Sequence, residues 1–258
     1  MLVSFSGGAD SVYLMIQLLK KMDASQITLL YFDHGLRPES KDEISFSKQF
    51  SDTHKVPLII QELDVLGYSK QQNCSLETAG RQMRYSSIIE KAKALQIPIV
   101  MTAHHGDDHC ESMLMKLIRG SGTHWGGIEA VFNLDDIHVV RPLLGVLKTD
   151  IVQYLKCNDI SFCTDESNNN LTFTRNRVRH SIMPHVRAIN PKYDESFHKL
   201  SAYFSEMRHY VDTVLEPVLK CVYQHQTYLE IPRNILKELP MFLRNEAIYR
   251  LIRIFRGF

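Results

Sequence analysis

The pattern of apolar and polar residues predicts strands that alternate with helices along the first two thirds of the chain. Each short apolar run suits a buried strand, and the segment after it has the spacing of a helix with one apolar face. The predicted strands cover residues 2–5, 27–32, 57–60, 97–101 and 137–140. Such alternation is typical of an α/β fold, in which helices cover both faces of a parallel, doubly wound sheet.

The predicted helices divide the chain into two regions. We expect helices over residues 12–19, 40–50, 76–95, 149–157, 193–221 and 240–255, and a further one between the strand 97–101 and Gly120. Residues 61–73 are predicted as a polar loop. Strands largely stop after Pro184. We therefore expect an α/β domain over residues 1–185 and a smaller helical region over residues 186–258.

Composition narrows the class of protein only a little. Of 258 residues, 44% are hydrophobic and 23% are charged, and the formal net charge is +1, which is typical of soluble globular proteins. No apolar run approaches the roughly 20 residues of a membrane span, and no secretory signal opens the chain. The five cysteines include no C-x-x-C pair, which argues against a disulfide framework or a structural metal site. These features predict a cytoplasmic protein with reduced thiols and no membrane partner.

The six-residue stretch SGGADS, residues 6–11, lies between the first predicted strand and the first predicted helix. Glycines let the backbone reach positive φ and approach a ligand closely, while the first N–H groups of the helix stay unpaired. Such a turn predicts an anion site, to which the serine hydroxyls add donors. Asp10 suits a helix cap or a ligand for Mg²⁺ that bridges phosphates. The turn holds no lysine, so it is not the Gly-Lys-Ser/Thr mononucleotide loop.

Two groups of polar residues on predicted helices are further candidates. Glu77, Arg81 and Arg84 share one helix face, which on its own favours a surface ion pair. His104, Asp108 and Glu111 follow at i, i+4 and i+7 on another helix. This second group allows three interpretations: a metal site, a solvated polar face, or a pocket that binds an ammonium group and removes its proton. The phosphate-type turn upstream makes the metal interpretation the weaker one.

Basic residues gather in two places toward the end of the chain. Three arginines and a histidine lie within residues 175–180 and favour a phosphate site over a solvated basic face. Residues 233–258 contain six basic and two acidic residues, a local charge of +4, with three aromatic residues between them. This end of the chain suits contact with an RNA backbone and, equally, an amphipathic packing helix.

Several motifs together resemble a known family. The segments are SGGADS at Ser6, DHGLRPES at Asp33, ETAGRQMRY at Glu77, TAHHGDDHCES at Thr102, LIRGSG at Leu117, RPLL at Arg141, TDESN at Thr164 and RNRVRH at Arg175. The first resembles the pyrophosphate loop of the N-type ATP pyrophosphatases, which is shared with GMP and NAD synthetases. The order and spacing of all of them resemble the tRNA(Ile)-lysidine synthase family, over roughly 70% of the chain. Members of that family normally carry a longer leader before the loop, and many continue into further tRNA-binding domains.

The resemblance implies a fold and a reaction. The fold is that of the adenine nucleotide alpha hydrolase-like ATP pyrophosphatases, with a catalytic domain over residues 1–185 and a helical linker with the start of a tRNA-binding domain over 186–258. The enzyme would adenylate O2 of the wobble cytidine, C34, of a tRNA(Ile) with a CAU anticodon. The amine of free L-lysine would then attack C2 and release AMP, with ATP and Mg²⁺ as the implied cofactors.

The resemblance also assigns roles to residues. ATP and its pyrophosphate would be held, with Arg81 as a helper, by Ser6, Gly7, Gly8, Ala9, Asp10, Ser11, Arg84, His104 and Arg177. Asp10 would hold Mg²⁺ and take part in catalysis, and Asp108 and Glu111 would bind the lysine ammonium. An ammonium with a pKa of about 10.4 is no nucleophile, so Asp108 is expected to act as its base. We expect tRNA contacts from Arg175, Arg179, Arg250 and Arg253.

Other functions remain open at this point. One is a tRNA cytidine thiolase with the same loop, which the absence of C-x-x-C pairs weakens. Another is a metal-dependent hydrolase centred on His34, His104, His105 and Asp108. The last is an RNA-binding relative without catalysis. The sequence leaves a homodimer open as an assembly.

Overall fold

The computed structural model describes residues 1–35, 40–120, 126–164 and 174–256. Parts of the motifs that begin at Asp33, Leu117 and Thr164 lie outside these residues. The chain divides into two compact units, the first made of Met1–Ser112 and Ile128–Ala188, the second of Met113–Gly127 and Ile189–Phe258. Each unit is described by itself.

The first unit is built on a six-stranded sheet with the order β3-β2-β1-β4-β6-β5. The strands are β1 (Leu2–Ser4), β2 (Thr28–Asp33), β3 (Leu58–Glu62), β4 (Ile99–Met101), β5 (Val131–Leu134) and β6 (Ile137–Val140). All neighbours pair in parallel except β5 and β6, which are antiparallel. The α/β class and the mostly parallel sheet predicted from the sequence are confirmed, with one antiparallel strand at the edge.

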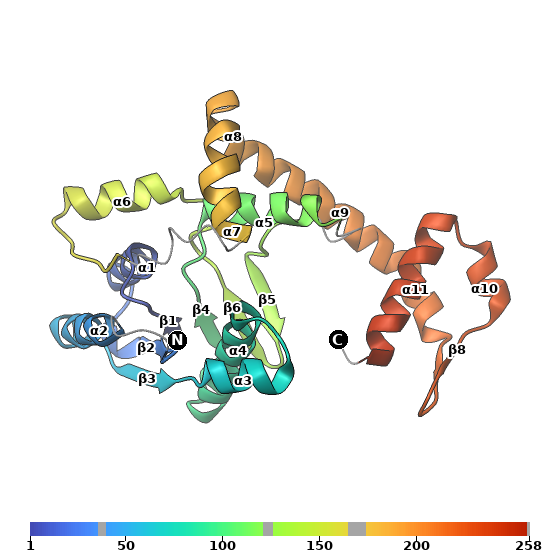
Figure 1. Cartoon of the computed structure of the whole chain (residues 1–258), viewed down its shortest axis with the longest axis horizontal. Helices are drawn as coiled ribbons and strands as arrows, with labels where there is room; N and C mark the ends of the chain where they lie inside the picture. Colours follow the sequence, from blue (N-terminus) through green and yellow to red (C-terminus); the bar gives the residue numbers. More distant parts are fainter. Residues whose placement is uncertain (36–39, 121–125, 165–173, 257–258) are drawn as a thin grey trace. The chain divides into compact units, whose positions relative to one another are not determined.

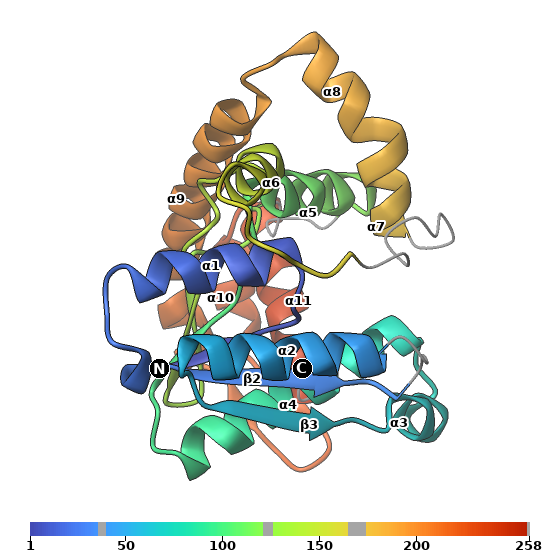
Figure 2. The same cartoon turned by 90° about the vertical axis from the view of Figure 1, so that its left-hand side faces the viewer.

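Helices cover both faces of this sheet. Those of the first unit, with α5 reaching into the second, are α1 (Ala9–Leu19), α2 (Ser40–His54), α3 (Val65–Gln72), α4 (Leu76–Ala94), α5 (Gly106–Ile118), α6 (Lys148–Cys157), α7 (Thr174–Arg177) and α8 (Met183–Ile189), with the short turns η1 (Ala24–Gln26) and η4 (Val178–Ile182). Figures 1 and 2 show α1, α2 and α6 on one face and α3 and α4 on the other.

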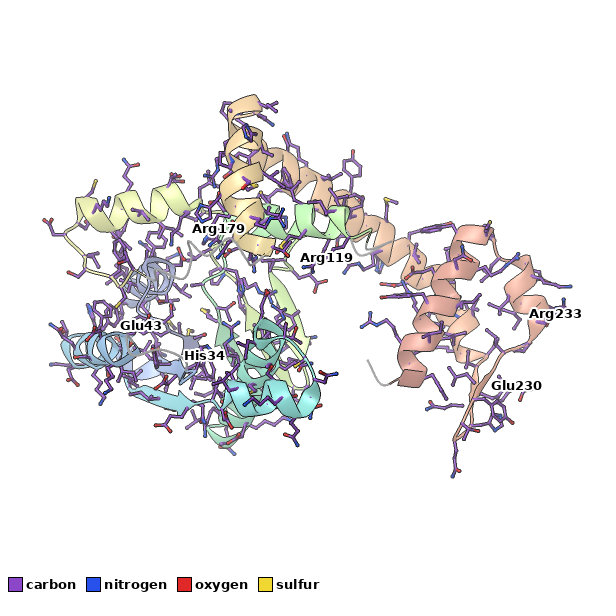
Figure 3. All side chains as sticks on the ribbon, in the orientation of Figure 1. His34, Glu43, Arg119, Arg179, Glu230 and Arg233 are labelled. Atoms are coloured by element: carbon purple, nitrogen blue, oxygen red, sulfur yellow. The ribbon has the colours of Figure 1, made fainter. Side chains whose placement is uncertain are left out.

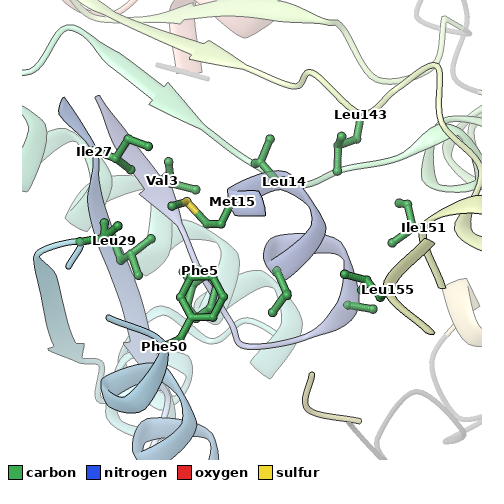
Figure 4. Close-up of a cluster of buried hydrophobic side chains, with 13 residues drawn as sticks. Val3, Phe5, Leu14, Met15, Ile27, Leu29, Phe50, Leu143, Ile151 and Leu155 are labelled. Atoms are coloured by element: carbon green, nitrogen blue, oxygen red, sulfur yellow. The ribbon is translucent and has the colours of Figure 1, made fainter. Parts of the chain in front are cut away.

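Successive residues of the central strands supply the two faces in turn, because side chains of a strand alternate. Val3 of β1 and Leu29 of β2 pack against α1, α2 and α6, in the cluster shown in Figure 4. Their neighbours Leu2 and Leu30 pack with α3 and α4 on the opposite face. All four of these strand residues are fully buried. Because both faces of each strand are covered, its sequence is an unbroken apolar run.

Two elements differ from the sequence prediction. Residues 65–72, predicted as a polar loop, form α3, whose N-terminus is capped by the Asp64 carboxylate accepting the Gly67 N–H at 2.9 Å. Val65 is its buried residue, and Asn73 ends it in the left-handed conformation. The strand β5 was not predicted, because it is a half-exposed edge strand that pairs only with β6. Asp135, at φ +52°, turns the chain between these two strands.

The second unit is mainly helical. Its elements are α9 (Tyr193–Lys220), the two-stranded β7 (Tyr223–Gln224) and β8 (Leu229–Glu230), α10 (Arg233–Glu238) and α11 (Met241–Arg256). Val211 and Leu215 of α9 pack against Ala247 of α11 in its core. Among the described residues, no helix combines the length and the apolar character that crossing a membrane requires.

Candidate functional site

The loop of residues 6–11, called here the glycine loop, joins the carboxyl end of β1 to the start of α1. Gly7 has φ +74°, and a Cβ there would lie 3.1 Å from Phe46 Cδ1, so glycine is required at this position. Gly8 precedes the first turn of α1 and makes no side-chain cap. The Ser11 hydroxyl accepts the Ser6 N–H at 3.2 Å and donates to the Gly8 carbonyl at 2.9 Å. The unpaired N–H groups at the N-terminus of α1 can therefore bind an anion at the loop.

A segment from far along the chain supports the loop from outside. The Cys163 N–H donates to the Gly7 carbonyl at 2.9 Å, and Cys163 forms an isolated parallel bridge with Gly8. Burial raises the pKa of the Cys163 thiol, and Glu43 and Asp42 act in the same direction. The thiol is therefore a packing group in its protonated form, and the main chain of Cys163 fixes the loop conformation.

A cavity of about 210 Å³ lies beside the glycine loop. It brings together residues from β1, α1, α4 and the start of α5, which the sequence places far apart. The lining residues are Ser4, Ser6, Asp10, Ser11, Arg81, Arg84, Tyr85, Ile88, Thr102, Ala103, His104 and Asp108. Most of the predicted ATP-site side chains thus share one cavity with the proposed base. Arg177 is exposed and is not among the lining residues, and Glu77 is also exposed.

Contacts near this cavity link the N-termini of α1, α5 and α6 to one another. The Asp107 carboxylate, in the first turn of α5, accepts the backbone N–H of Lys148, the first residue of α6, at 2.8 Å. The Lys148 ammonium in turn binds Asp10 Oδ1, in the first turn of α1, at 2.6 Å. Sequence reasoning missed Lys148. Its only signal was its position soon after the segment Arg141-Pro142-Leu143-Leu144.

His105 lies among three carboxylates at the same point. Its Nε2 is 3.8 Å from Asp10 Oδ2 and 3.5 Å from Asp108 Oδ2, and its Nδ1 is 3.7 Å from Asp107 Oδ2. The imidazole is buried, with 4% of its surface exposed. These contacts are longer than hydrogen bonds. His105 therefore lies between Asp10 of the glycine loop and the acidic residues of α5.

The acidic pair, Asp108 and Glu111, is held by two arginines. Glu111, which is fully buried, accepts from Arg175 Nε at 3.1 Å and from Arg179 Nε at 2.7 Å. Arg179 also donates to Asp108 Oδ1 at 3.1 Å. Arg179 lies in η4, directly after α7, and is labelled in Figure 3. Two of the four arginines predicted to contact tRNA thus bind the carboxylates predicted to receive lysine.

The ionisation of Asp108 follows from these contacts. Burial acts to raise its pKa, but the electrostatic effect of the nearby His105, Arg175 and His104 and the hydrogen bond from the His105 N–H outweigh burial and lower the pKa. The His105 N–H donates to Asp108 Oδ2 at 3.1 Å. Asp108 is therefore a carboxylate at neutral pH, the form that a general base requires.

The pKa of His104 is also lowered, which for a histidine favours the uncharged form. Burial lowers its pKa to about 4, and Arg141, Arg175 and Arg81 act in the same direction against Asp108. Its Nδ1 lies 2.9 Å from Thr102 Oγ1. At neutral pH the ring is uncharged and can donate or accept a hydrogen bond within the cavity.

In the second unit, the two predicted tRNA contacts differ in environment. Arg250 is bound by Asp212 at 2.6 Å and by Glu246 at 2.9 Å. Burial would lower its pKa, but these two carboxylates raise it. Arg253 is exposed on α11. The exposed cation is the more accessible of the two to a phosphate.

No group of three or more His, Cys, Asp or Glu side chains within the described residues is arranged to hold a metal ion. The hydrolase alternative, centred on His34, His104, His105 and Asp108, therefore has no metal centre in this part of the chain. Asp10 remains as one carboxylate in the cavity, and Mg²⁺ is commonly held by one or two carboxylates together with substrate phosphates. The residues present fit that mode of binding.

Comparison with known proteins agrees with this geometry. The chain matches the PP-loop domain family over residues 1–186. It is 32% identical over 202 residues to a tRNA(Ile)-lysidine synthase of Petrotoga mobilis, covering 78% of this chain and 64% of that protein. It is 29% identical over 252 residues to the enzyme of the same name from Bacillus subtilis, covering 96% and 53%. The chain spans between about half and two thirds of the length of these relatives.

A solved structure shows the same fold. The U34-tRNA thiolase NcsA of Methanococcus maripaludis, with its [4Fe-4S] cluster, superposes with a TM-score of 0.66 at 13% identity, over 80% of this chain and 70% of that one. A glycine loop at the carboxyl edge of a mostly parallel sheet, next to a cavity, is the arrangement of α/β nucleotide-binding proteins. Within that class, the chain belongs to the PP-loop family.

Proposed function

We propose that this protein forms lysidine: it joins free L-lysine to C2 of the wobble cytidine, C34, of a tRNA(Ile) whose anticodon is CAU. The observation that carries the proposal is the single cavity that joins the glycine loop to Asp108. The names of the relatives, all tRNA(Ile)-lysidine synthases, support the same reaction. The chain would be an ATP-dependent carbon–nitrogen ligase of the cytoplasm, with residues 1–185 as its catalytic domain.

ATP would bind with its outer phosphates at the glycine loop. The N–H groups at the start of α1 and the hydroxyls of Ser6 and Ser11 suit phosphate oxygens. Asp10, whose carboxylate also binds Lys148, would hold Mg²⁺. A bound Mg²⁺ would neutralise charge on the phosphates. Arg84, which lines the cavity, would contact the phosphate chain, with Arg81 beside it.

The reaction would run in two steps. Cytosine O2 attacks the α-phosphorus of ATP, the bond between the α- and β-phosphates breaks, and pyrophosphate leaves. The lysine amine then attacks C2, the bond between C2 and the adenylate oxygen breaks, and AMP leaves. Neutral His104 would donate a hydrogen bond within the cavity, and Asp108 would take a proton from the ammonium before it attacks.

The acidic pair cannot receive lysine as it stands in the structure. Arg179 and Arg175 already bind Glu111, and Arg179 also binds Asp108. An incoming ammonium must displace at least the Arg179 guanidinium, and a released arginine is a natural partner for tRNA phosphates. Lysine binding would therefore depend on tRNA binding.

Residues 186–258, with exposed Arg253, would form a helical linker and the start of a tRNA-binding domain.

The test is to incubate the full chain with ATP, labelled lysine and an unmodified tRNA(Ile) transcript. We expect label to enter the RNA and AMP to appear in equal amounts. A transcript with uridine at position 34 is the matched control and should take up no label. Formation of AMP without label in the RNA would contradict the proposal.

A variant of Asp108, the proposed general base, distinguishes lysine incorporation from ATP binding. Asp108→Asn keeps the size of the side chain but removes the carboxylate, so lysine incorporation should fall about 10²- to 10⁴-fold. ATP affinity, measured by calorimetry, should stay within a few-fold of the parent protein. Unchanged incorporation would show that Asp108 is not the base.

A further inference from the structure

The glycine loop contains no lysine, but a lysine of α6 contacts it in the folded protein. Lys148 is the first residue of that helix, 138 positions from Asp10 along the chain, and its Nζ lies 2.6 Å from Asp10 Oδ1. The side chain of Lys148 is 40% exposed and that of Asp10 is 29% exposed. An exposed ion pair of this kind is exchangeable, because water and other ions compete for both partners.

The position of Lys148 is fixed by contacts that do not involve its ammonium. Its backbone N–H donates to the buried Asp107 carboxylate, which Arg187 also binds. Further along α6, Ile151 and Leu155 are fully buried in the core against α1. The base of the side chain is therefore anchored beside Asp107 whether or not the ammonium binds Asp10.

The hydrogen-bonding capacity of the ammonium points to a second partner. A lysine ammonium has three donors, and Asp10 Oδ1 takes one of them. Asp10 lines the cavity together with Ser6 and Ser11 of the glycine loop. An anion at the loop would lie beside the carboxylate of Asp10 and be repelled by it, unless a cation is placed between them. The Lys148 ammonium, bound to Asp10 Oδ1, supplies a positive charge of the chain's own beside that carboxylate.

We propose that Lys148 binds the phosphate groups held by the glycine loop and stabilises pyrophosphate as it leaves ATP. The inference rests on the nucleotide site of the proposed function. As the bond between the α- and β-phosphates breaks, negative charge builds on the β-phosphate oxygens. A fixed ammonium there lowers the energy of that charge more than that of the intact triphosphate.

The experiment is calorimetry of the full chain with two probes, inorganic pyrophosphate and AMP. Lys148→Met should weaken pyrophosphate binding about tenfold to a hundredfold, the loss expected for a charge-assisted hydrogen bond, and should leave AMP binding unchanged. Lys148→Arg keeps the charge and should retain most of the affinity. Lys156→Met removes an exposed lysine from the last turn of the same helix and is the matched control.

Two results would overturn the inference. One is pyrophosphate affinity in Lys148→Met equal to that of the parent protein. The other is full recovery of affinity in the double variant Asp10→Asn/Lys148→Met, which would show that Lys148 serves only to neutralise Asp10. Neither probe involves lysine or tRNA. A protein that binds pyrophosphate through Lys148 but makes no lysidine would refute the proposed function alone, and the converse result would refute this inference alone.

Discussion

Two parts of the site, named here after their proposed ligands, both pair carboxylates with cations but differ in burial: the phosphate end, with Asp10 and Lys148, and the amine end, with Glu111 and two arginines. At the phosphate end, Asp10 and Lys148 are 29% and 40% exposed. At the amine end, Glu111 is fully buried and bound by two arginines. An exposed pair gains little from its contact and opens at little cost, whereas breaking a buried pair leaves a charge without compensation. The ion pair at the phosphate end should therefore open at little cost, and the pairs at the amine end only at a larger one.

The largest expected effect is at the buried end. Glu111→Ala leaves the guanidinium groups of Arg175 and Arg179 without their shared acceptor, and the free energy of unfolding should fall by about 3 to 5 kcal/mol. Asp10→Ala at the exposed end should change it by about 1 kcal/mol or less. Chemical denaturation of both variants makes the comparison. Equal losses would show that burial does not distinguish the two ends.

A smaller effect is expected from the backbone of the phosphate end. Gly7→Ala places a Cβ at φ +74°, 3.1 Å from Phe46 and 3.3 Å from Cys163 Sγ. The free energy of unfolding should fall by about 1 to 3 kcal/mol. Gly8 has φ −72° and room for a methyl group at 3.4 Å from Ser6 Oγ, so Gly8→Ala should stay within about 0.5 kcal/mol. If thermal unfolding finds the two variants alike, the loop is not held as rigidly as described.

The smallest effect concerns pH, at His104 between the two ends. Its pKa is about 4 in the folded protein and about 6.5 in an unfolded chain. Above pH 6.5 the ring is neutral in both states and contributes nothing. As the pH falls below 6.5, the unfolded state takes up the proton first, so stability is lost until the pH reaches about 4. His104→Gln should therefore lose about 1 to 2 kcal/mol less between pH 7 and pH 5, as measured by urea unfolding at each pH. An identical pH dependence would contradict the assignment.

Much of the first unit could be predicted because its information is local. Leu2 and Val3 are neighbours that enter opposite cores, and this double burial gives the strand its apolar run. The helix α3 was not predicted because it has one buried residue, Val65, and one capping residue, Asp64. Its sequence therefore has little of the apolar periodicity that marks a helix. The edge strand β5 has a single pairing partner and exposed side chains, so it lacks the signature of the central strands.

The site was predicted in its parts but not in its connections. The SGGADS stretch and the spacing of His104 and Asp108 are visible along the chain, and the structure places them at one cavity. The pairing of Arg179 with Glu111, 68 positions apart, depends on tertiary contacts that no short pattern encodes. The same holds for Lys148. The roles of these residues in binding and catalysis stay predictions.

The support of the glycine loop by Cys163 has a consequence for synthesis of the protein. The loop leaves the ribosome before the segment that supports it, because the amide that fixes Gly7 belongs to a residue made after most of the first unit. A nascent chain cannot complete its nucleotide pocket until that later segment has emerged and docked. Folding of this unit therefore depends on contacts between distant parts of the chain, a topology associated with slow folding.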